Sequence, residues 1–241
     1  YDSMDSGTPA NAGVPVAALS AGSIESDPEI SGWDLMTVDS DLEDEDESNF
    51  ISKPSSSYRW GGWSGQSVSI DENGEYLAIS DYGRYATAYY SGEVRIYKRK
   101  LNSGESKNYF DDNPMITIAG SEYYGRLGFS LSMSSDGNFL AIGEPYKSAN
   151  GSYSGRVLIY ERSGDSWSDT DVSLAGGAAY VYAGGSVALN SDGTVLAVYQ
   201  FGGSPRKISI WKKDGSSWSS PFEIENSSFP ANSEFKVVIS D

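Results

Sequence analysis

The residues able to do chemistry in this chain are carboxylates, hydroxyls, amines and phenols, because it contains no histidine and no cysteine. A Ser-His-Asp triad, a Cys-His pair and a zinc site of the usual nitrogen and sulfur type are therefore excluded within it. A carboxylate glycoside hydrolase remains, and it needs two carboxylates roughly 5 to 9.5 Å apart across a sugar. Asp81 and Glu144 share a position in the sequence repeat and are the pair for that role. We expect the chain not to be an enzyme and keep this hydrolase as the less favoured alternative.

Tyrosines form the second group of candidate residues, and they gather in the segments 81–92 and 144–155. A tyrosine combines a flat apolar face with a hydroxyl group, which suits stacking on sugars or contact with proteins. Asp81, Glu144 and Gln200 occupy one repeat position, so they are predicted to ring one mouth of a central channel. An alternative stays open, in which these polar groups end strands and the tyrosines pack on their neighbours. The predicted ligand-binding residues are Asp81, Tyr82, Tyr85, Tyr89, Tyr90, Glu144, Tyr146 and Tyr153.

A calcium site is considered at the turn that carries Asp71, Asn73 and Glu75, where oxygen-bearing side chains alternate. Calcium takes 6 to 8 oxygen ligands, and the turn is short for that number, so a plain hairpin turn is favoured and no cofactor is expected. Two Asn-x-Ser motifs, at Asn150 and Asn226, are predicted N-glycosylation sites.

The elements that position these residues recur along the chain. An alternating strand, a four-residue turn ending in glycine and a second apolar strand appear three times, with the turn glycines at Gly74, Gly137 and Gly193. Such a turn indicates a β-hairpin, because glycine accepts the positive φ that the turn requires. The period of about 60 residues is typical of a repeat architecture. The predicted strand pairs are 65–70 with 75–79, 128–133 with 138–142, and 184–189 with 194–198.

Each hairpin is followed by two further strands. A third strand is predicted at 93–97, 156–160 and 207–211, and a weaker fourth at 115–119, 170–175 and 221–225. Four antiparallel strands in each unit describe the blade of a β-propeller. The predicted fold is therefore all-β, with three blades, at about 60–120, 121–176 and 177–228, and the first strand of a fourth at 229–241.

The N-terminal part has a different composition. Residues 1–58 hold 13 of the 34 acidic residues and one basic residue, Lys53. We interpret 1–57 as an extended acidic low-complexity leader and 58–241 as a partial propeller. This charge disfavours nucleic acid as a partner, and no apolar run is long enough for membrane insertion.

The recurring phrase, Ser-Val-Ser-Ile/Leu, Asp/Asn-Gly, Leu-Ala-Ile and then Gly-x-Val-x-Ile-Tyr, resembles the FG-GAP repeats of integrin α-type propellers. It is more similar still to FG-GAP-like repeats of surface proteins from microbes and algae. The resemblance covers about residues 60–241. Its calcium-binding turns carry acids at alternate positions, and this sequence departs from that pattern.

The resemblance implies a place outside the cell or at its surface, and ligand binding by the loops between the second and third strands. The first hypothesis is a non-enzymatic structural or interaction module whose blades serve protein–protein assembly or adhesion. The alternative is a propeller that binds a glycan or a protein through its tyrosine-rich loops. The expected partners are proteins or neighbouring subunits, or else glycans.

Overall fold

The computed structural model describes residues 64–100, 109–110, 113–230 and 235–239. The acidic leader predicted at 1–57 lies outside these residues. The described part is all-β and contains no helix, and hence none long and apolar enough to cross a membrane. Its strands form three antiparallel sheets, each built from one sequence repeat.

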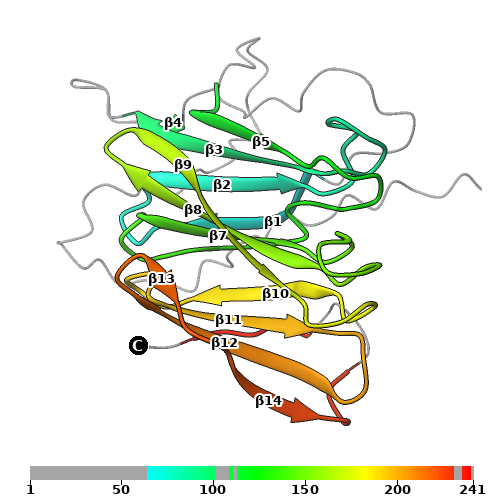
Figure 1. The fold of residues 1–241 in the computed structure, drawn as a ribbon. Helices are drawn as coiled ribbons and strands as arrows, with labels where there is room; N and C mark the ends of the chain where they lie inside the picture. The colour runs from blue at the N-terminus through cyan, green and yellow to red at the C-terminus, as the bar shows by residue number, and fades with distance from the viewer. Residues whose placement is uncertain (1–63, 101–108, 111–112, 231–234, 240–241) are drawn as a thin grey trace, which may run out of the picture. The chain divides into compact units, whose positions relative to one another are not determined.

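Each sheet is one propeller blade, and the blades follow one another in chain order in Figure 1. In each blade the first strand pairs with the second, the second with the third, and the third with the predicted fourth, which is the topology that the repeat predicted; the short β4 and β13 pair with the far ends of β3 and β12. The first blade contains β1 (Ser64–Ile70), β2 (Tyr76–Asp81), β3 (Glu93–Lys100), β4 (Tyr109–Phe110) and β5 (Ile116–Ala119). The second contains β6 (Ser130–Met133), β7 (Phe139–Glu144), β8 (Arg156–Ser163) and β9 (Ser166–Ala175). The third contains β10 (Ala183–Leu189), β11 (Val195–Gln200), β12 (Arg206–Asp214), β13 (Ser217–Trp218) and β14 (Phe222–Asn226).

In each hairpin turn that begins a blade, the side chain of the first turn residue accepts a hydrogen bond from the backbone of the second strand. Gly74, Gly137 and Gly193 hold φ values of 61°, 65° and 69°, as the turns require. In the first turn the Asp71 carboxylate accepts a hydrogen bond from the Tyr76 N–H at 2.6 Å. The Ser134 hydroxyl and the Asn190 amide oxygen accept the equivalent bond in the next two turns, at 2.9 and 2.7 Å. Three different side chains therefore make the equivalent hydrogen bond between the turn and the second strand.

Two hydrophobic cores hold the blades together, one at each junction. At the first junction, Tyr76, Val94 and Ile96 of the first blade pack with Leu140 and Ile142 of the second. The second junction joins the other face of the second blade to the third, and its members larger than alanine are Phe139, Val157, Ile159, Val187, Leu189, Leu196, Val198 and Trp211. The middle blade is thus apolar on both faces, and all six residues of β7 are buried. Burial on both faces is what face-to-face stacking of blades requires.

Serine hydroxyls on the innermost strands link each blade to the next. Leu131 N–H donates to Ser67 Oγ at 3.0 Å, and Met133 N–H donates to Ser69 Oγ at 2.8 Å. One repeat later, Leu189 N–H donates to Ser132 Oγ at 2.9 Å. These bonds satisfy backbone donors on the inner strands that pair with only one neighbour in their own sheet.

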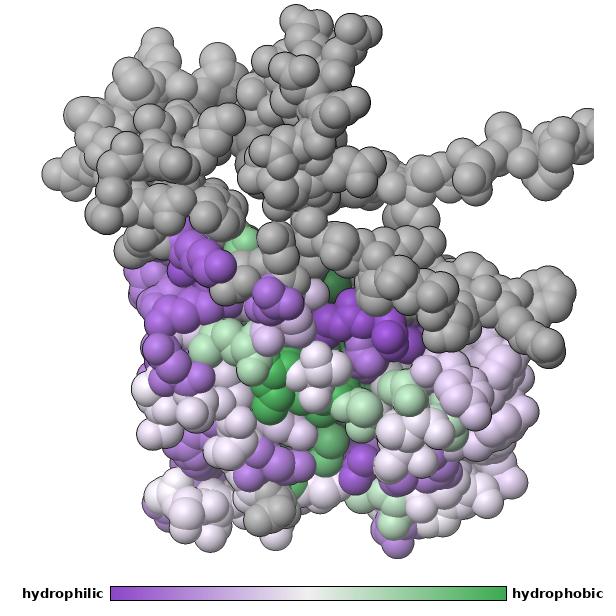
Figure 2. All heavy atoms as spheres, turned by 90° about the horizontal axis from the view of Figure 1, so that it is seen from above, coloured by the Kyte–Doolittle hydropathy of each residue, from purple (hydrophilic) through white to green (hydrophobic). Residues whose placement is uncertain are grey.

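Residues 235–239 make the same contact with the third blade. Val237 N–H donates to Ser186 Oγ at 3.1 Å, and the Phe235 ring lies 4.7 Å from that of Tyr199 between centroids. This segment stands where the first strand of a fourth blade is predicted. Ala188, however, occupies the place that Ser69 and Ser132 hold in the earlier repeats, so it offers no second hydroxyl. Seen from above, apolar residues reach the surface as a narrow band between hydrophilic ones (Figure 2).

Candidate ligand-binding edge

Two pairs of loops, one at each junction between blades, form the candidate site. The first pair is residues 82–92 with 120–128, and the second is residues 145–155 with 176–184. Within each pair the loop between the second and third strands of one blade runs beside the loop that leads into the next blade. Isolated parallel bridges join Gly92 to Leu127 and Gly155 to Ala183.

The backbone bonds of the two loop pairs are the same, residue for residue. In the first pair, Tyr124 and Arg126 donate their N–H groups to the carbonyls of Tyr89 and Tyr90, at 2.9 and 3.0 Å. The second pair repeats these bonds, from Tyr180 to Ser152 at 2.8 Å and from Tyr182 to Tyr153 at 3.1 Å. The conformation is therefore a property of the repeat and not of one loop.

Glycine makes this close approach feasible. Gly92 and Gly155 have φ values of 85° and 72°, and a Cβ on either would lie 2.2 Å from a carbonyl oxygen of the facing loop. No side chain fits there. Next to them, the buried hydroxyls of Ser91 and Ser154 accept backbone N–H groups from within their own loops, as from Asn150 to Ser154 at 2.8 Å.

The same loops hold tyrosines in a left-handed backbone conformation. In the described part of the chain, every non-glycine residue with positive φ belongs to these two loop pairs. These residues occupy equivalent positions in the two repeats: Tyr90 is equivalent to Tyr153, Tyr124 to Tyr180, and Arg126 to Tyr182. Their φ values run from 49° at Tyr153 to 61° at Tyr124. For a residue with a Cβ this conformation costs roughly 1 to 2 kcal/mol.

The rings of the first pair form one cluster. Tyr90 and Tyr124 stack with an interplanar angle of 11° and centroids 5.2 Å apart. Tyr89 contacts both of them and also Tyr123. The second pair also has a stack, but between other positions: Tyr153 stacks on Tyr182 at 11°, with centroids 6.0 Å apart, whereas Tyr180, the equivalent of Tyr124, is tilted by 59° against Tyr153.

A line of aromatic rings runs from Tyr82, in the first loop pair, to the cluster of the second pair. Phe129 contacts Tyr82 on one side and Tyr146 on the other. The Arg126 guanidinium lies 4.4 Å from the centroid of the Tyr146 ring and 5.7 Å from that of Tyr82. Tyr182, at the equivalent place, contacts Tyr146 and stacks on Phe201. We call this whole surface the tyrosine edge, and it consists of Tyr82, Tyr85, Tyr89, Tyr90, Tyr123, Tyr124, Arg126, Phe129, Tyr146, Tyr153, Tyr180, Tyr182 and Phe201.

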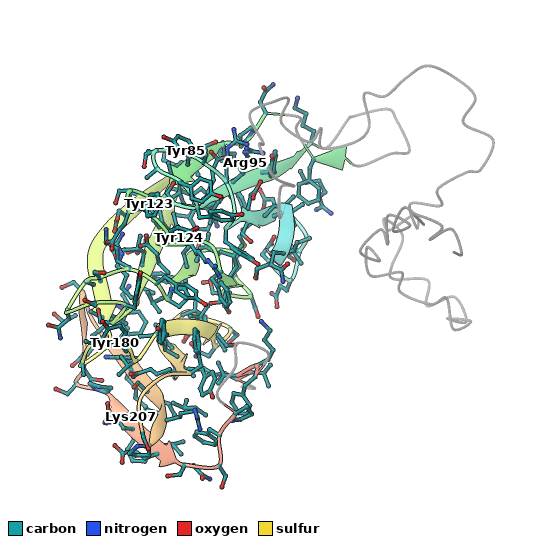
Figure 3. The ribbon with its side chains drawn as sticks, turned by 90° about the vertical axis from the view of Figure 1, so that its right-hand side faces the viewer. Tyr85, Arg95, Tyr123, Tyr124, Tyr180 and Lys207 are labelled. Carbon is teal, nitrogen blue, oxygen red and sulfur yellow. The ribbon has the colours of Figure 1, made fainter. Side chains whose placement is uncertain are left out.

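Several rings of the tyrosine edge are open to solvent. Tyr123 is 62% exposed, Tyr85 60%, Tyr180 55% and Tyr153 38%. Figure 3 shows Tyr85, Tyr123, Tyr124 and Tyr180 along one margin of the molecule, from the first blade toward the third. The edge therefore offers a row of accessible aromatic faces that crosses both blade junctions.

The phenols of the edge are hydrogen-bond donors at neutral pH. Burial raises the pKa of Tyr82, although Arg126 partly offsets it, and burial also raises the pKa of Tyr182. A hydrogen bond with Tyr90 raises the pKa of Tyr89. Since an unperturbed tyrosine already titrates near pH 10, all three keep their protons.

The predicted ring of polar groups lies inside the protein. Asp81, Glu144 and Gln200 are only 3%, 0% and 5% exposed. Glu144 accepts a hydrogen bond from Arg156 Nε at 2.6 Å through Oε2, while Oε1 has no partner among the described residues. Burial raises the pKa of Glu144, and the Arg156 charge limits the rise. As a ligand-contacting pair, Asp81 and Glu144 stay a prediction, and in this structure both are closed to solvent.

The residues of the calcium candidate have other contacts. Asp71 is buried and bonded to backbone N–H groups, whereas Glu75 faces Lys98 at 3.6 Å. Among the described residues, no group of three or more acidic side chains has the arrangement of a metal site. Both sequon asparagines, Asn150 and Asn226, are exposed.

The structure adds residues that the sequence analysis missed. It brings together Tyr89 with Tyr90, and Tyr146 with Tyr153, as part of one edge, and Tyr85 lies on the same margin (Figure 3). The missed residues lie in the loops leading into the second and third blades, namely Tyr123, Tyr124, Arg126, Phe129, Tyr180, Tyr182 and Phe201. A signal existed, because Tyr124-Gly-Arg-Leu-Gly128 and Tyr180-Val-Tyr-Ala-Gly184 place a tyrosine four residues before the same glycine.

Comparisons with known proteins leave the family open. No protein-family model matches the chain, and no curated protein does, so the resemblance to FG-GAP repeats stays a prediction from the motif. Among solved structures, the β-propeller domain of Cps50 (Swd1) from Myceliophteria thermophila matches with 9% identity and a TM-score of 0.41, over 66% of this chain and 43% of that one. TolB from Acinetobacter baumannii matches with 12% identity and a TM-score of 0.36, over 64% and 31%.

A third match is a Bacteroides fragilis protein provisionally assigned as a 6-phosphogluconolactonase, with 17% identity and a TM-score of 0.47, over 68% of this chain and 42% of that one. The chain spans less than half the length of each of these three solved chains. The fold follows from the molecule itself, whose three stacked antiparallel sheets, of five, four and five strands, are blades of a β-propeller.

Proposed function

We propose that this chain is a non-enzymatic interaction module that holds a ligand along the tyrosine edge. The observation that carries the proposal is the recurrence of tyrosine at left-handed backbone positions, at equivalent places in two repeats. Glycine accepts this conformation freely, and asparagine and aspartate accept it better than other residues do. A loop selected only for its backbone would favour those residues. Tyrosine at five such positions supports a role for the ring itself.

The accessibility of the rings supports the same function. Rings that served only the core would be buried, whereas Tyr123 and Tyr180 expose more than half of their surface. Strained residues that the surrounding structure holds in place cluster at binding sites, where they pre-organise the surface for its ligand. The hydrogen bonds between the loops provide that support here.

A binding survey tests the proposal. Peptide and glycan arrays are screened with the wild-type chain and with a Tyr124→Ala, Tyr180→Ala double variant, after circular dichroism has established that the variant is folded. We expect ligands that bind the wild type and lose at least tenfold in affinity with the variant. The proposal fails if no ligand distinguishes the two proteins. For the hydrolase alternative, the decisive variants are Asp81→Asn and Glu144→Gln, and glycosidase activity that survives both would end it.

Assembly through the end blades is a second candidate function, which a separate observation favours. Phe222 and Ile224 on β14 of the third blade are 68% and 41% exposed, and Val68 and Ile70 on β1 of the first are 52% and 45% exposed. Apolar sheet faces of this kind suit stacking against another sheet. Light scattering over a range of concentrations, with Phe222→Lys as the comparison, tests this; a mass that is independent of both concentration and substitution argues against it.

We also propose that the protein lies outside the cell or at its surface, and that its repeats are related to FG-GAP repeats. The exposed sequons at Asn150 and Asn226 agree with export. In a secreted preparation from a eukaryotic host, treatment with a peptide N-glycosidase is expected to lower the apparent mass. Asn150→Gln and Asn226→Gln assign the two sites, and an unchanged mass contradicts glycosylation.

A further inference from the structure

The loops of the tyrosine edge contain few acidic side chains that could accept hydrogen bonds. The four loops that carry it contain ten tyrosines and a single acidic residue, Glu122. Glu122 is engaged, because Lys147 lies 3.0 Å from its carboxylate and the Ser148 N–H also bonds to it. These bonds outweigh the effect of burial and lower the pKa of Glu122. The ten tyrosines are Tyr82, Tyr85, Tyr89, Tyr90, Tyr123, Tyr124, Tyr146, Tyr153, Tyr180 and Tyr182.

The other acidic groups near the edge are buried or paired. Asp81 and Glu144 are closed to solvent, and Glu93 is bound by Arg84 at 2.9 Å and by Arg95. What the edge presents to a ligand is therefore aromatic faces, phenol donors and the Arg126 guanidinium. A fitting ligand supplies acceptors and requires few in return.

This requirement separates two ligand classes. Each sugar hydroxyl donates a hydrogen bond as well as accepting one, so carboxylate acceptors favour a glycan, and the carboxylates near this edge are buried or paired. A polyproline II helix has the opposite character, because proline has no N–H and the backbone carbonyls make no internal bonds. Aromatic-lined grooves bind such helices by packing on the proline rings and donating to the carbonyls.

The usual distance between stacked sheets also suits a polyproline II helix. The clusters repeat from one blade to the next, and stacked sheets lie about 10 Å apart. One turn of polyproline II has three residues and rises roughly 9 Å, since each residue adds about 3.1 Å. One helical turn therefore matches one blade, and equivalent rings in successive repeats meet equivalent residues of the ligand.

We propose that the tyrosine edge binds a proline-rich segment in the polyproline II conformation, laid across the blade junctions with one turn per blade. This inference rests on the proposed function, because it names the ligand class of the same site. Pre-formed polyproline II loses little conformational entropy on binding, and the loops are likewise held in place before the ligand arrives.

Titration calorimetry with a twelve-residue proline peptide tests the inference. We expect binding by the wild-type chain, a loss of at least tenfold in affinity in the Tyr124→Ala, Tyr180→Ala double variant, and no change in Val238→Ala. Val238 is the control, since it is an exposed apolar residue that lies outside the tyrosine edge and outside the candidate assembly faces. Circular dichroism establishes that all variants are folded.

Further comparisons test whether the phenol hydroxyls donate to the ligand and whether the ligand must be rich in proline. Tyr180→Phe keeps the ring and removes the hydroxyl, so we expect it to lose a few-fold in affinity if phenols donate to the ligand's carbonyls. A glycine-serine peptide of the same length, and a soluble cello-oligosaccharide, are expected not to bind. Failure of the proline peptide to bind at millimolar concentration overturns the inference, and so does equal binding by the double variant. If the oligosaccharide binds through the tyrosines and the proline peptide does not, the ligand class is wrong while the proposed function stands.

Discussion

The two loop pairs of the tyrosine edge share a backbone and differ in side chains. At equivalent places the first pair carries Arg126 where the second carries Tyr182, and Tyr123 where the second carries Ala179. The backbone bonds and the left-handed residues nevertheless coincide. The repeat therefore fixes the scaffold, and the side chains set how each junction meets a ligand. The first pair contributes the Arg126 guanidinium, which lies over Tyr82 of its own pair and Tyr146 of the second, and the second pair contributes Tyr182, which stacks on Tyr153.

The largest effect is expected from breaking the scaffold of one pair. Gly155→Ala forces a Cβ to within 2.2 Å of the Ala183 carbonyl at a positive φ, and should lower the free energy of unfolding by about 3 kcal/mol or more. Gly164→Ala is the control, because Gly164 also has a positive φ, of 60°, but meets no atom within 4 Å. It should cost only about 1 kcal/mol. Urea unfolding measures both; equal losses would show that the close approach of the loops is unimportant.

A second change makes the middle blade resemble the third. Glu144→Gln places at the end of β7 the residue type that Gln200 provides in β11. Because burial raises the folded-state pKa of Glu144, the wild-type carboxyl stabilises the fold most below its unfolded pKa, and that contribution disappears as the pH rises through the folded pKa. The surrounding charges are Arg156, Lys147 and Glu122.

Relative to Glu144→Gln, the wild type should therefore lose stability as the pH rises from about 4 toward neutrality. Unfolding curves of both proteins at a series of pH values provide the measurement. A difference that does not depend on pH, or that grows in the opposite direction, contradicts the assignment of this titration to Glu144.

The strain of the left-handed tyrosines gives a smaller effect. Tyr180→Gly relieves the φ of 60°, whereas Tyr180→Ala removes the ring and keeps the strain. The glycine variant should be more stable than the alanine variant by about 0.5 to 1 kcal/mol, while both lose ligand affinity. Thermal unfolding compares them. Equal stability of the two would mean that the left-handed backbone is not costly at this position.

The smallest effect is expected from exchanging the side chains that distinguish the pairs. Arg126→Tyr replaces a cation–π contact by an aromatic one, and the two contribute similar amounts, so stability should change by less than about 0.5 kcal/mol. Binding should change more: preference for acidic over neutral proline-rich peptides should fall, because the guanidinium is gone. Calorimetry with both peptides checks this, and an unchanged preference would assign the selectivity elsewhere.

The sequence predicted the fold in detail and the site in part. Repeated hairpin signals located four strands in each blade, because a turn glycine and alternating side chains are local properties. Each predicted strand of the three blades overlaps an observed one, whereas residues 235–239, where the fourth blade was predicted to begin, are not assigned as a strand, and β4 and β13 were not foreseen. Those two short strands extend the third strands into hairpins beyond the repeated phrase.

The edge was only half predicted because its other half is a consequence of stacking. Tyr124 and Tyr180 become neighbours of the preceding loop only when one blade packs on another, and backbone preference would not have placed tyrosine in a left-handed conformation. Burial of Asp81 and Glu144 was equally hidden, since an acidic residue at the end of a strand is more often exposed. The acidic leader, at 1–57, lies outside the described residues.

The serine hydroxyls between the inner strands bear on how this repeat array unfolds. Because blades are joined by apolar faces and by side-chain-to-backbone bonds instead of a shared sheet, each blade is a cooperative unit coupled to its nearest neighbours. The first junction has two such bonds, from Leu131 to Ser67 and from Met133 to Ser69. Beyond the third blade Ser186 provides one, and Ala188 provides none. Fraying should therefore begin at the segment 235–239 and reach the middle blade last, which native-state hydrogen exchange would register as graded protection along the array.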